Sequence, residues 1–187
     1  GDLDAFLYRL LEAIRLIGLL VSPVMPRAAV RLLRMLGVAE AEEEPGPEGF
    51  LHFFIGIAYR SLDQPDSALV HWNQALPIIR ETGPRNVEAD VLAAVAVLYK
   101  DLDQPDSVLT YYGQELSILR ELGDQSGEVA TLNEIGTIHL GMGRADSAIA
   151  SFGLALEVLR SMGDRAQEGR LLLNIGAVHH SLGETDS

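Results

Sequence analysis

The chain of 187 residues is 48% hydrophobic and 22% charged, which is typical of a folded globular protein and excludes extensive disorder. Its 27 acidic and 14 basic side chains give a net charge of −13, which disfavours nucleic acid as a partner because phosphate would be repelled. The chain has no cysteine, so disulfides and thiol chemistry are excluded and a reducing compartment fits.

The most apolar stretch, residues 3–21, carries four charged side chains. These charges exclude a membrane span and a signal peptide with an uncharged apolar core. We therefore expect a soluble, cytoplasmic protein that does not bind a membrane. The first residue is Gly1 rather than Met, which indicates that the chain was cut from a longer one.

Residues 1–38 are predicted to form two helices. In the first, apolar residues recur at alternating spacings of four and three from Leu3 to Val21 and form one narrow seam. The second follows the turn "SPVMP" and ends at Gly37. Another face of the second helix carries three arginines: Arg27, Arg31 and Arg34.

The stretch "LEAIRLIGLLVSPVMPRAAVRLLRMLGV" resembles the final helices of the anticodon-binding domain of methionyl-tRNA synthetases, which share the "P-x-M-P" turn. Under this resemblance the three arginines contact tRNA phosphate. The alternative is that the arginines lie on a solvated helix face or pair with the acidic segment nearby. The acidic charge of the rest of the chain favours this alternative over tRNA contact. The catalytic domain and ATP-binding signatures of that family are absent from this chain.

Residues 39–49, "AEAEEEPGPEG", combine an acidic run with Pro and Gly and are predicted to be a solvated linker. After it the sequence repeats every 40 residues, as the Asp-Ser pairs at 66/67, 106/107, 146/147 and 186/187 show. Within each repeat the apolar spacing predicts two helices separated by a turn. The predicted units are 50–89, 90–129 and 130–169, followed by a partial unit at 170–187.

The repeated residues at the helix ends are predicted to be helix signals. The first three Asp-Ser pairs place an aspartate where its side chain would cap the second helix of a unit: Asp66, Asp106 and Asp146. An arginine in the last turn complements the helix dipole, and a glycine three residues later ends the helix. These residues are Arg80, Arg120 and Arg160, with Gly83, Gly123 and Gly163.

Glycine also recurs inside the first helix of a unit, at Gly56, Gly136 and Gly176. A helical glycine costs about 1 kcal/mol relative to alanine, so we expect a packing reason for it. Close approach of the second helix would supply this reason, with Ala68 or Ala148 at the contact and the aromatics Trp72 and Phe152 one turn further on.

The pattern Ile135-Gly136, His139, Ala148, Phe152 and Ala155 resembles the tetratricopeptide repeat (TPR), in a variety longer than the usual 34 residues. The resemblance covers about residues 49–187 and implies an all-α solenoid of helix-turn-helix repeats, preceded by the two N-terminal helices. It also implies a concave groove lined by the first helix of each unit. The implied groove residues are Phe53, Arg60, Ala93, Lys100, Asn133, Thr137, Asn174 and His180.

Within this groove, an acidic peptide group could bridge Arg60 and Lys100, which share one slot of the repeat. Asn133 and Asn174 could hydrogen-bond a peptide backbone. The alternative for each of these residues is a side chain that merely faces solvent.

No enzyme signature is found: the sequence lacks an HExxH helix, a glycine-rich phosphate loop and a GxSxG elbow. His139 and His179 occupy the slot of Tyr59 and Tyr99, which favours packing over metal binding. We therefore expect no catalytic residues, no metal and no cofactor in this chain.

The leading functional hypothesis is a protein-interaction module that binds a peptide or partner protein in the groove. The alternative is the C-terminal part of a methionine-tRNA ligase-like enzyme with a repeat extension, and a third interpretation is a fusion without joint function. The partial last unit should leave one apolar face without a partner helix, which predicts self-association or fraying. This face comprises Leu171, Leu172, Ile175 and Val178.

Overall fold

The structure is a computed structural model that describes residues 47–185, with side chains described from 48 to 180. The two helices predicted for residues 1–38, with Arg27, Arg31 and Arg34, lie outside the described residues, and so does the methionyl-tRNA synthetase resemblance. The same holds for most of the linker predicted at 39–49. Its last three residues belong to the first described helix.

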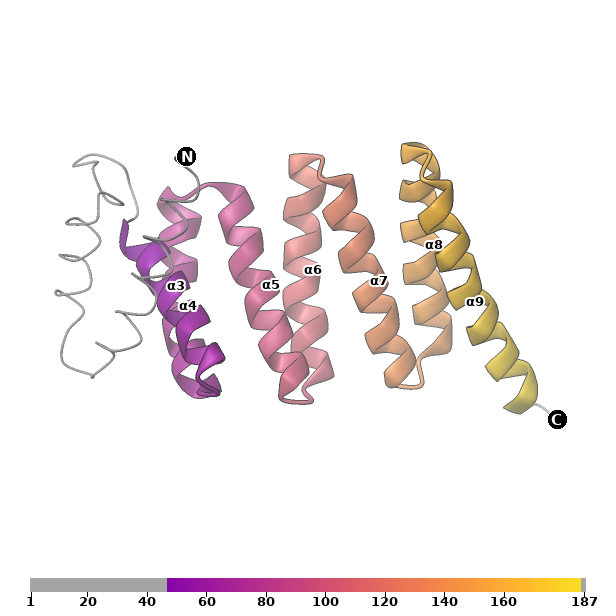
Figure 1. Ribbon diagram of the computed structural model, residues 1–187, viewed down its shortest axis with the longest axis horizontal. Helices are drawn as coiled ribbons and strands as arrows, with labels where there is room; N and C mark the ends of the chain where they lie inside the picture. Colours follow the sequence, from indigo (N-terminus) through magenta and orange to yellow (C-terminus); the bar gives the residue numbers. More distant parts are fainter. Residues whose placement is uncertain (1–46, 186–187) are drawn as a thin grey trace, which may run out of the picture. The chain divides into compact units, whose positions relative to one another are not determined.

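Residues 47–185 form seven helices and contain no strand, so the all-α class is confirmed for the described part of the chain (Figure 1). Equivalent helices begin 40 residues apart, at Pro65, Pro105 and Ala145 for the second helix of each pair. The helices are α3 (Pro47–Ser61), α4 (Pro65–Thr82), α5 (Arg85–Asp101), α6 (Pro105–Leu122), α7 (Gln125–Gly141), α8 (Ala145–Met162) and α9 (Arg165–Thr185).

The chain divides into two compact units, Gly1–Ala94 and Val95–Ser187, and α5 spans the boundary between them. In the first unit α3 packs against α4. In the second unit α7 packs against both α6 and α8, and α8 packs against α9. Each contact joins consecutive helices, as expected for helix-turn-helix repeats.

The predicted capping role of Asp66, Asp106 and Asp146 is wrong. All three lie inside the first turn of their helices, whose N-cap residues are Gln64, Gln104 and Arg144, and none of these N-caps makes a side-chain capping bond. In α4 and α6 the reason is a proline at the first helical position, whose fixed φ angle starts the helix before the aspartate. The aspartates still complement the helix dipole.

Side-chain caps occur instead at the start of two first helices, α7 and α9. Asp124 accepts a hydrogen bond from the Gly127 backbone N–H at 2.9 Å at the start of α7. Asp164 accepts one from the Gln167 N–H at 3.0 Å at the start of α9. The capping aspartate therefore belongs to the sequence "GD" that closes one unit and opens the next.

The predicted helix ends are confirmed. Gly83, Gly123 and Gly163 follow the ends of α4, α6 and α8, and the last two adopt the left-handed conformation with φ of 69° and 74°. The arginines lie in the last turns as predicted, and each also pairs with a glutamate eight residues later, in the following helix. The Nε to Oε1 distances are 2.8 Å for Arg80–Glu88, 2.6 Å for Arg120–Glu128 and 2.9 Å for Arg160–Glu168.

The close approach predicted at Gly56 and Gly136 is confirmed, with one correction. A Cβ on Gly56 would lie 2.2 Å from Nε1 of Trp72, and a Cβ on Gly136 would lie 2.4 Å from Cε1 of Phe152. The glycines therefore make room for the aromatic rings themselves, not for the alanines one turn earlier. The indole N–H of Trp72 also donates to the Phe53 carbonyl at 3.0 Å.

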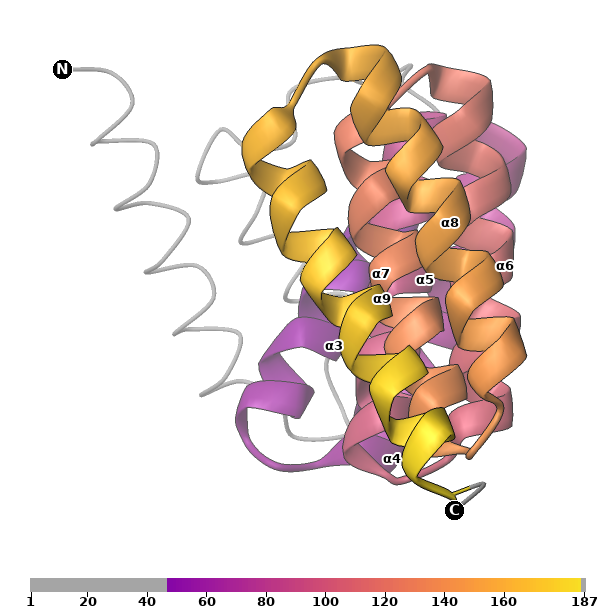
Figure 2. The same cartoon turned by 90° about the vertical axis from the view of Figure 1, so that its right-hand side faces the viewer.

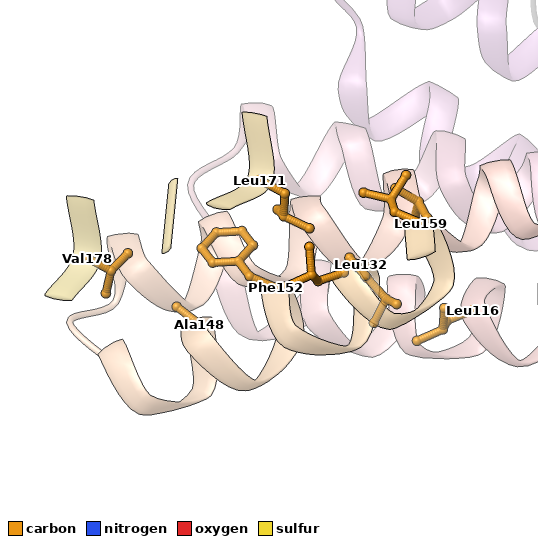
Figure 3. Packing of buried hydrophobic residues seen from close by; sticks show 10 residues of the cluster. Leu116, Leu132, Ala148, Phe152, Leu159, Leu171 and Val178 are labelled. Atoms are coloured by element: carbon orange, nitrogen blue, oxygen red, sulfur yellow. The ribbon is translucent and has the colours of Figure 1, made fainter. Parts of the chain in front are cut away.

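In the second unit, a continuous apolar core joins α6, α7, α8 and α9 (Figure 3). Phe152 is its largest side chain and is 2% exposed. Leu171 and Val178 of α9 are buried in this core, so the prediction that they would lack a partner is wrong for these two residues. They face α8, whereas Leu172 is 45% exposed. Ile175 is half-buried against the same core.

Candidate binding surface

The structure places the predicted groove residues in both compact units. Phe53, Arg60 and Ala93 lie in the first, and the other five lie in the second. The backbone carbonyl of Phe53 is already used by the indole of Trp72. Arg60 and Lys100 belong to different units, so their joint contact with one acidic group stays a prediction.

In the second unit, the end of α5 and the middle of α7 are joined by an ion pair. The Lys100 ammonium donates to the Glu134 carboxylate at 2.6 Å, and both side chains are partly exposed. Lys100 therefore has a partner within the chain. A ligand carboxylate that binds Lys100 has to compete with Glu134.

Two further predicted residues lie next to this ion pair on α7. Asn133 is half-buried, and Thr137, one turn later, is exposed and donates its hydroxyl to the Asn133 backbone carbonyl at 2.9 Å. The Thr137 hydroxyl oxygen and the Asn133 side-chain amide can both still hydrogen-bond a ligand. We call Lys100, Asn133, Glu134 and Thr137 the α5–α7 surface.

The remaining predicted residues, Asn174 and His180, are exposed on α9. They lie in the second unit, like the α5–α7 surface. Their part in a common groove stays a prediction.

A histidine pair that the sequence reasoning missed lies between α3 and α4. The two Nδ1 atoms of His52 and His71 are 2.9 Å apart, and their ring planes differ by 28°. One ring must donate its N–H while the other accepts, so the two Nδ1 atoms cannot both be protonated in this contact. The ring of Tyr59 lies over His71, with the centroids 5.2 Å apart.

Burial disfavours the charged form of both imidazoles. It lowers the pKa of His52, while the Glu48 carboxylate acts in the opposite direction. Burial also lowers the pKa of His71, and the neighbouring His52 adds to this effect.

The sequence spacing contains a signal for this histidine pair. His52 and His71 are 19 residues apart, and so are Phe53 and Trp72, which also meet across the α3–α4 pair.

His139 agrees with its predicted packing role, because it is half-buried in the slot of Tyr99. Burial and the nearby charge of Arg144 lower its pKa. Its Nδ1 atom is buried and has no hydrogen-bond partner among the described residues. His179, in the same slot of α9, is exposed instead.

Within residues 47–185, no group of three or more His, Cys, Asp or Glu side chains is placed to hold a metal ion. The helices in this range also include none with the length and apolar character needed to cross a membrane. The described residues present polar side chains on the first helices of the repeats. The repeated apolar core fixes the positions of these helices.

These features define the class: an α-solenoid repeat protein with a TPR-type fold. No family model matches the sequence, and no curated protein matches it. Solved structures, by contrast, do match.

Three of the matching structures have 20% identity or less to this chain, a level that supports the fold alone. The BtubC (BKLC) protein from P. vanneervenii has a TM-score of 0.65 at 20% identity, over 84% of this chain and 66% of that one. A signal-transduction ATPase with a tetratricopeptide repeat sensor from Pyrococcus horikoshii has a TM-score of 0.69 at 19% identity, over 91% and 26%. A Rap protein complexed with Competence and Sporulation Factor has a TM-score of 0.55 at 16% identity, over 84% and 44%. The chain thus spans less than two thirds of each of these proteins.

Proposed function

We propose that this chain is a protein-interaction scaffold that binds a peptide segment on the first helices of its repeats. The observation that carries the proposal is the α5–α7 surface, where a lysine, an amide and a hydroxyl lie together on two first helices. The Rap protein with a similar fold was solved with a bound factor, and this supports a binding role for such a fold.

The chemistry of the α5–α7 surface indicates which charged side chains the peptide has. A ligand carboxylate can replace Glu134 on Lys100 at small cost, because a partly exposed ion pair contributes at most about 1 kcal/mol. The Asn133 amide can donate to and accept from an extended backbone. The net charge of −13 attracts basic flanking residues. The proposed ligand is therefore a peptide with one acidic side chain in an otherwise basic or neutral segment.

The test is a library of short synthetic peptides that varies the position of one acidic residue and the charge of its flanks. Binding to the full chain is measured by fluorescence anisotropy. We expect the peptides with one acid and basic flanks to bind best. Lys100→Ala and Asn133→Ala should each weaken their binding by about tenfold, a loss of about 1.4 kcal/mol.

Arg165→Ala is the matched control, because Arg165 is an exposed basic residue in the first turn of α9, away from the α5–α7 surface. This variant should leave binding unchanged. Equal binding by the unaltered chain and by the Lys100→Ala and Asn133→Ala variants would overturn the proposal, and so would a library without any binder.

A further inference from the structure

The ion pair between Lys100 and Glu134 does not belong to the repeated pattern of the fold. Forty residues before and after Glu134 the chain has Ala94 and Asn174, so the helix pairs form without a carboxylate at this slot. The arginine–glutamate pairs at the helix junctions, by contrast, recur every 40 residues. The repeated fold therefore does not account for a glutamate at position 134.

Both side chains of this ion pair can take a second partner. The Lys100 side chain is 44% exposed and the Glu134 side chain is 38% exposed. The Lys100 ammonium has three N–H donors and uses one of them, toward Oε2 of Glu134. The other carboxylate oxygen, Oε1, has no hydrogen-bond partner among the described residues.

The ion pair lies on the first helices of the repeats. In the second unit, α7 and α9 form one layer and α6 and α8 form the other (Figure 2). Lys100 at the end of α5 reaches Glu134 in the middle of α7. A peptide that lies across these two helices therefore meets a positive and a negative charge side by side.

The neighbouring negative charge affects how an acidic peptide binds. A peptide acid that takes the place of Glu134 on Lys100 stays close to the Glu134 carboxylate, because α7 holds both residues of this site on one surface. Two negative charges at such a short separation repel each other. A basic side chain of the peptide removes this repulsion if it donates to the Glu134 carboxylate. The four charges then alternate in sign.

We propose that Glu134 is a specificity-determining residue of the α5–α7 surface, which selects peptides with a basic side chain on the same face as their acid. This inference rests on the proposed function of that surface. In an extended peptide, side chains two positions apart point to the same face, and immediate neighbours point to opposite faces. The selected class is therefore an extended segment with Lys or Arg two residues from its Asp or Glu.

A glutamate that only competes for Lys100 would give a different pattern. Such a competitor weakens every acidic peptide to the same degree, wherever the basic residues of the peptide lie. A glutamate that contacts a basic side chain instead favours the peptides whose bases can reach it. The two roles are separated by comparing peptides that differ only in the position of their bases.

The test uses two fluorescein-labelled peptides of identical composition. Each has one glutamate, two lysines and threonine at the other positions, and threonine favours the extended conformation. In the same-face peptide the lysines lie two residues before and two residues after the glutamate. In the opposite-face peptide they are its immediate neighbours. Because lysines lie on both sides, the comparison does not depend on the direction in which the peptide binds.

Fluorescence anisotropy measures the affinity of the full chain for each peptide. We expect the same-face peptide to bind about threefold to fivefold more tightly, the range for one partly exposed ion pair. In Glu134→Gln this preference should disappear, because an amide has no charge to pair with lysine. The ratio of the two affinities is the readout, since the loss of Glu134 also frees Lys100 and strengthens the binding of both peptides.

Glu157→Gln is the matched control. Glu157 is exposed on α8, a second helix, and its replacement changes the net charge of the chain by the same amount. This variant should keep the preference for the same-face peptide. Circular dichroism should be alike for the unaltered chain and both variants.

Equal binding of the two peptides by the unaltered chain would overturn the role of Glu134. So would a preference that persists in Glu134→Gln or is lost in Glu157→Gln. If Lys100→Ala weakens binding while Glu134→Gln keeps the ratio, only the role of Glu134 fails. If neither these peptides nor the library bind, the proposed function of the α5–α7 surface fails as well.

Discussion

Glycine occupies the same slot in α7 and α9, but its surroundings differ. A Cβ on Gly136 would overlap the Phe152 ring, whereas a Cβ on Gly176 would lie more than 4 Å from the rest of residues 47–180 outside its own helix backbone. We expect Gly136→Ala to lower the free energy of unfolding by about 1–3 kcal/mol, because the core is overpacked. Gly176→Ala should raise it by up to about 1 kcal/mol, because alanine favours the helix.

Urea unfolding followed by circular dichroism measures both glycine variants against the unaltered chain. Opposite signs of the two stability changes are expected if an aromatic ring covers the glycine in α7 but not the glycine in α9. Destabilisation by Gly176→Ala would show that another part of the chain covers this position.

The aspartates at the helix starts are of two kinds. Asp124 caps α7 through the Gly127 N–H, whereas Asp146 lies in the first turn of α8 without a capping role. Asp124→Ala should therefore lower the free energy of unfolding by about 1 kcal/mol. Asp146→Ala should lower it by no more than about 0.5 kcal/mol, because only the dipole term is lost. Thermal unfolding of both variants measures the two losses of stability. Equal losses, or a larger loss for Asp146→Ala, would contradict the assignment of the caps.

An arginine and a glutamate join each second helix to the following first helix. The pair in the first unit is the most buried, with the Glu88 side chain 5% exposed, and Glu88 also accepts from Arg85. The Glu168 side chain is 24% exposed. The arginine–glutamate pair therefore contributes a different amount to the free energy of unfolding in each repeat.

We expect Glu88→Gln to lower the free energy of unfolding by about 2–4 kcal/mol, since it removes the buried carboxylate to which Arg80 and Arg85 both donate. Glu168→Gln should cost less than about 1 kcal/mol and serves as its control. Chemical denaturation in low and high salt measures both. Equal losses for the two variants would show that burial of Glu88 is unimportant.

The α3–α4 pair should respond to acid through His52 and His71. Both have a lowered pKa in the fold, so the unfolded chain binds more protons between the ordinary value of 6.5 and the folded values. The stability that their neutral forms supply is complete above about pH 6.5 and is lost as the pH falls below it. Protonation of both Nδ1 atoms also breaks their hydrogen bond.

Unfolding at pH 7.5 and at pH 5.5 tests this dependence. The loss of stability on acidification should be smaller in His71→Gln than in the unaltered chain. In the control His179→Gln, which changes an exposed histidine, the loss should stay the same. If His71→Gln lost as much stability on acidification as the unaltered chain, the histidine pair would not be the cause of the acid sensitivity.

For the molecule as a whole, the 40-residue period was enough to predict the helix pairs and the contacts at Gly56 and Gly136. It did not predict the partners of Arg80, Arg120 and Arg160, because an ion pair between two helices depends on the geometry of the turn between them. The capping aspartates were misplaced because α4, α6 and α8 begin two residues earlier than predicted, in α4 and α6 with a proline at the first helical position. The histidine pair was missed because its 19-residue spacing becomes informative only once the register of α3 against α4 is known.

The candidate binding surface was less predictable than the fold. The sequence named Lys100, Asn133 and Thr137, and the structure places them on two first helices of one compact unit. It did not reveal that Glu134 already pairs with Lys100, because the two residues are 34 positions apart and lie in different repeats. Competition between Glu134 and a ligand follows from the packing of these helices.

We propose that the first helices of the repeats carry the peptide-binding surface. Amide chemical shifts of the full chain, recorded with and without the best peptide of the library, test this proposal. We predict that the shift changes gather at the end of α5 and the middle of α7, around Lys100, Asn133 and Thr137. Changes confined to the second helices α6 and α8 would contradict the claim.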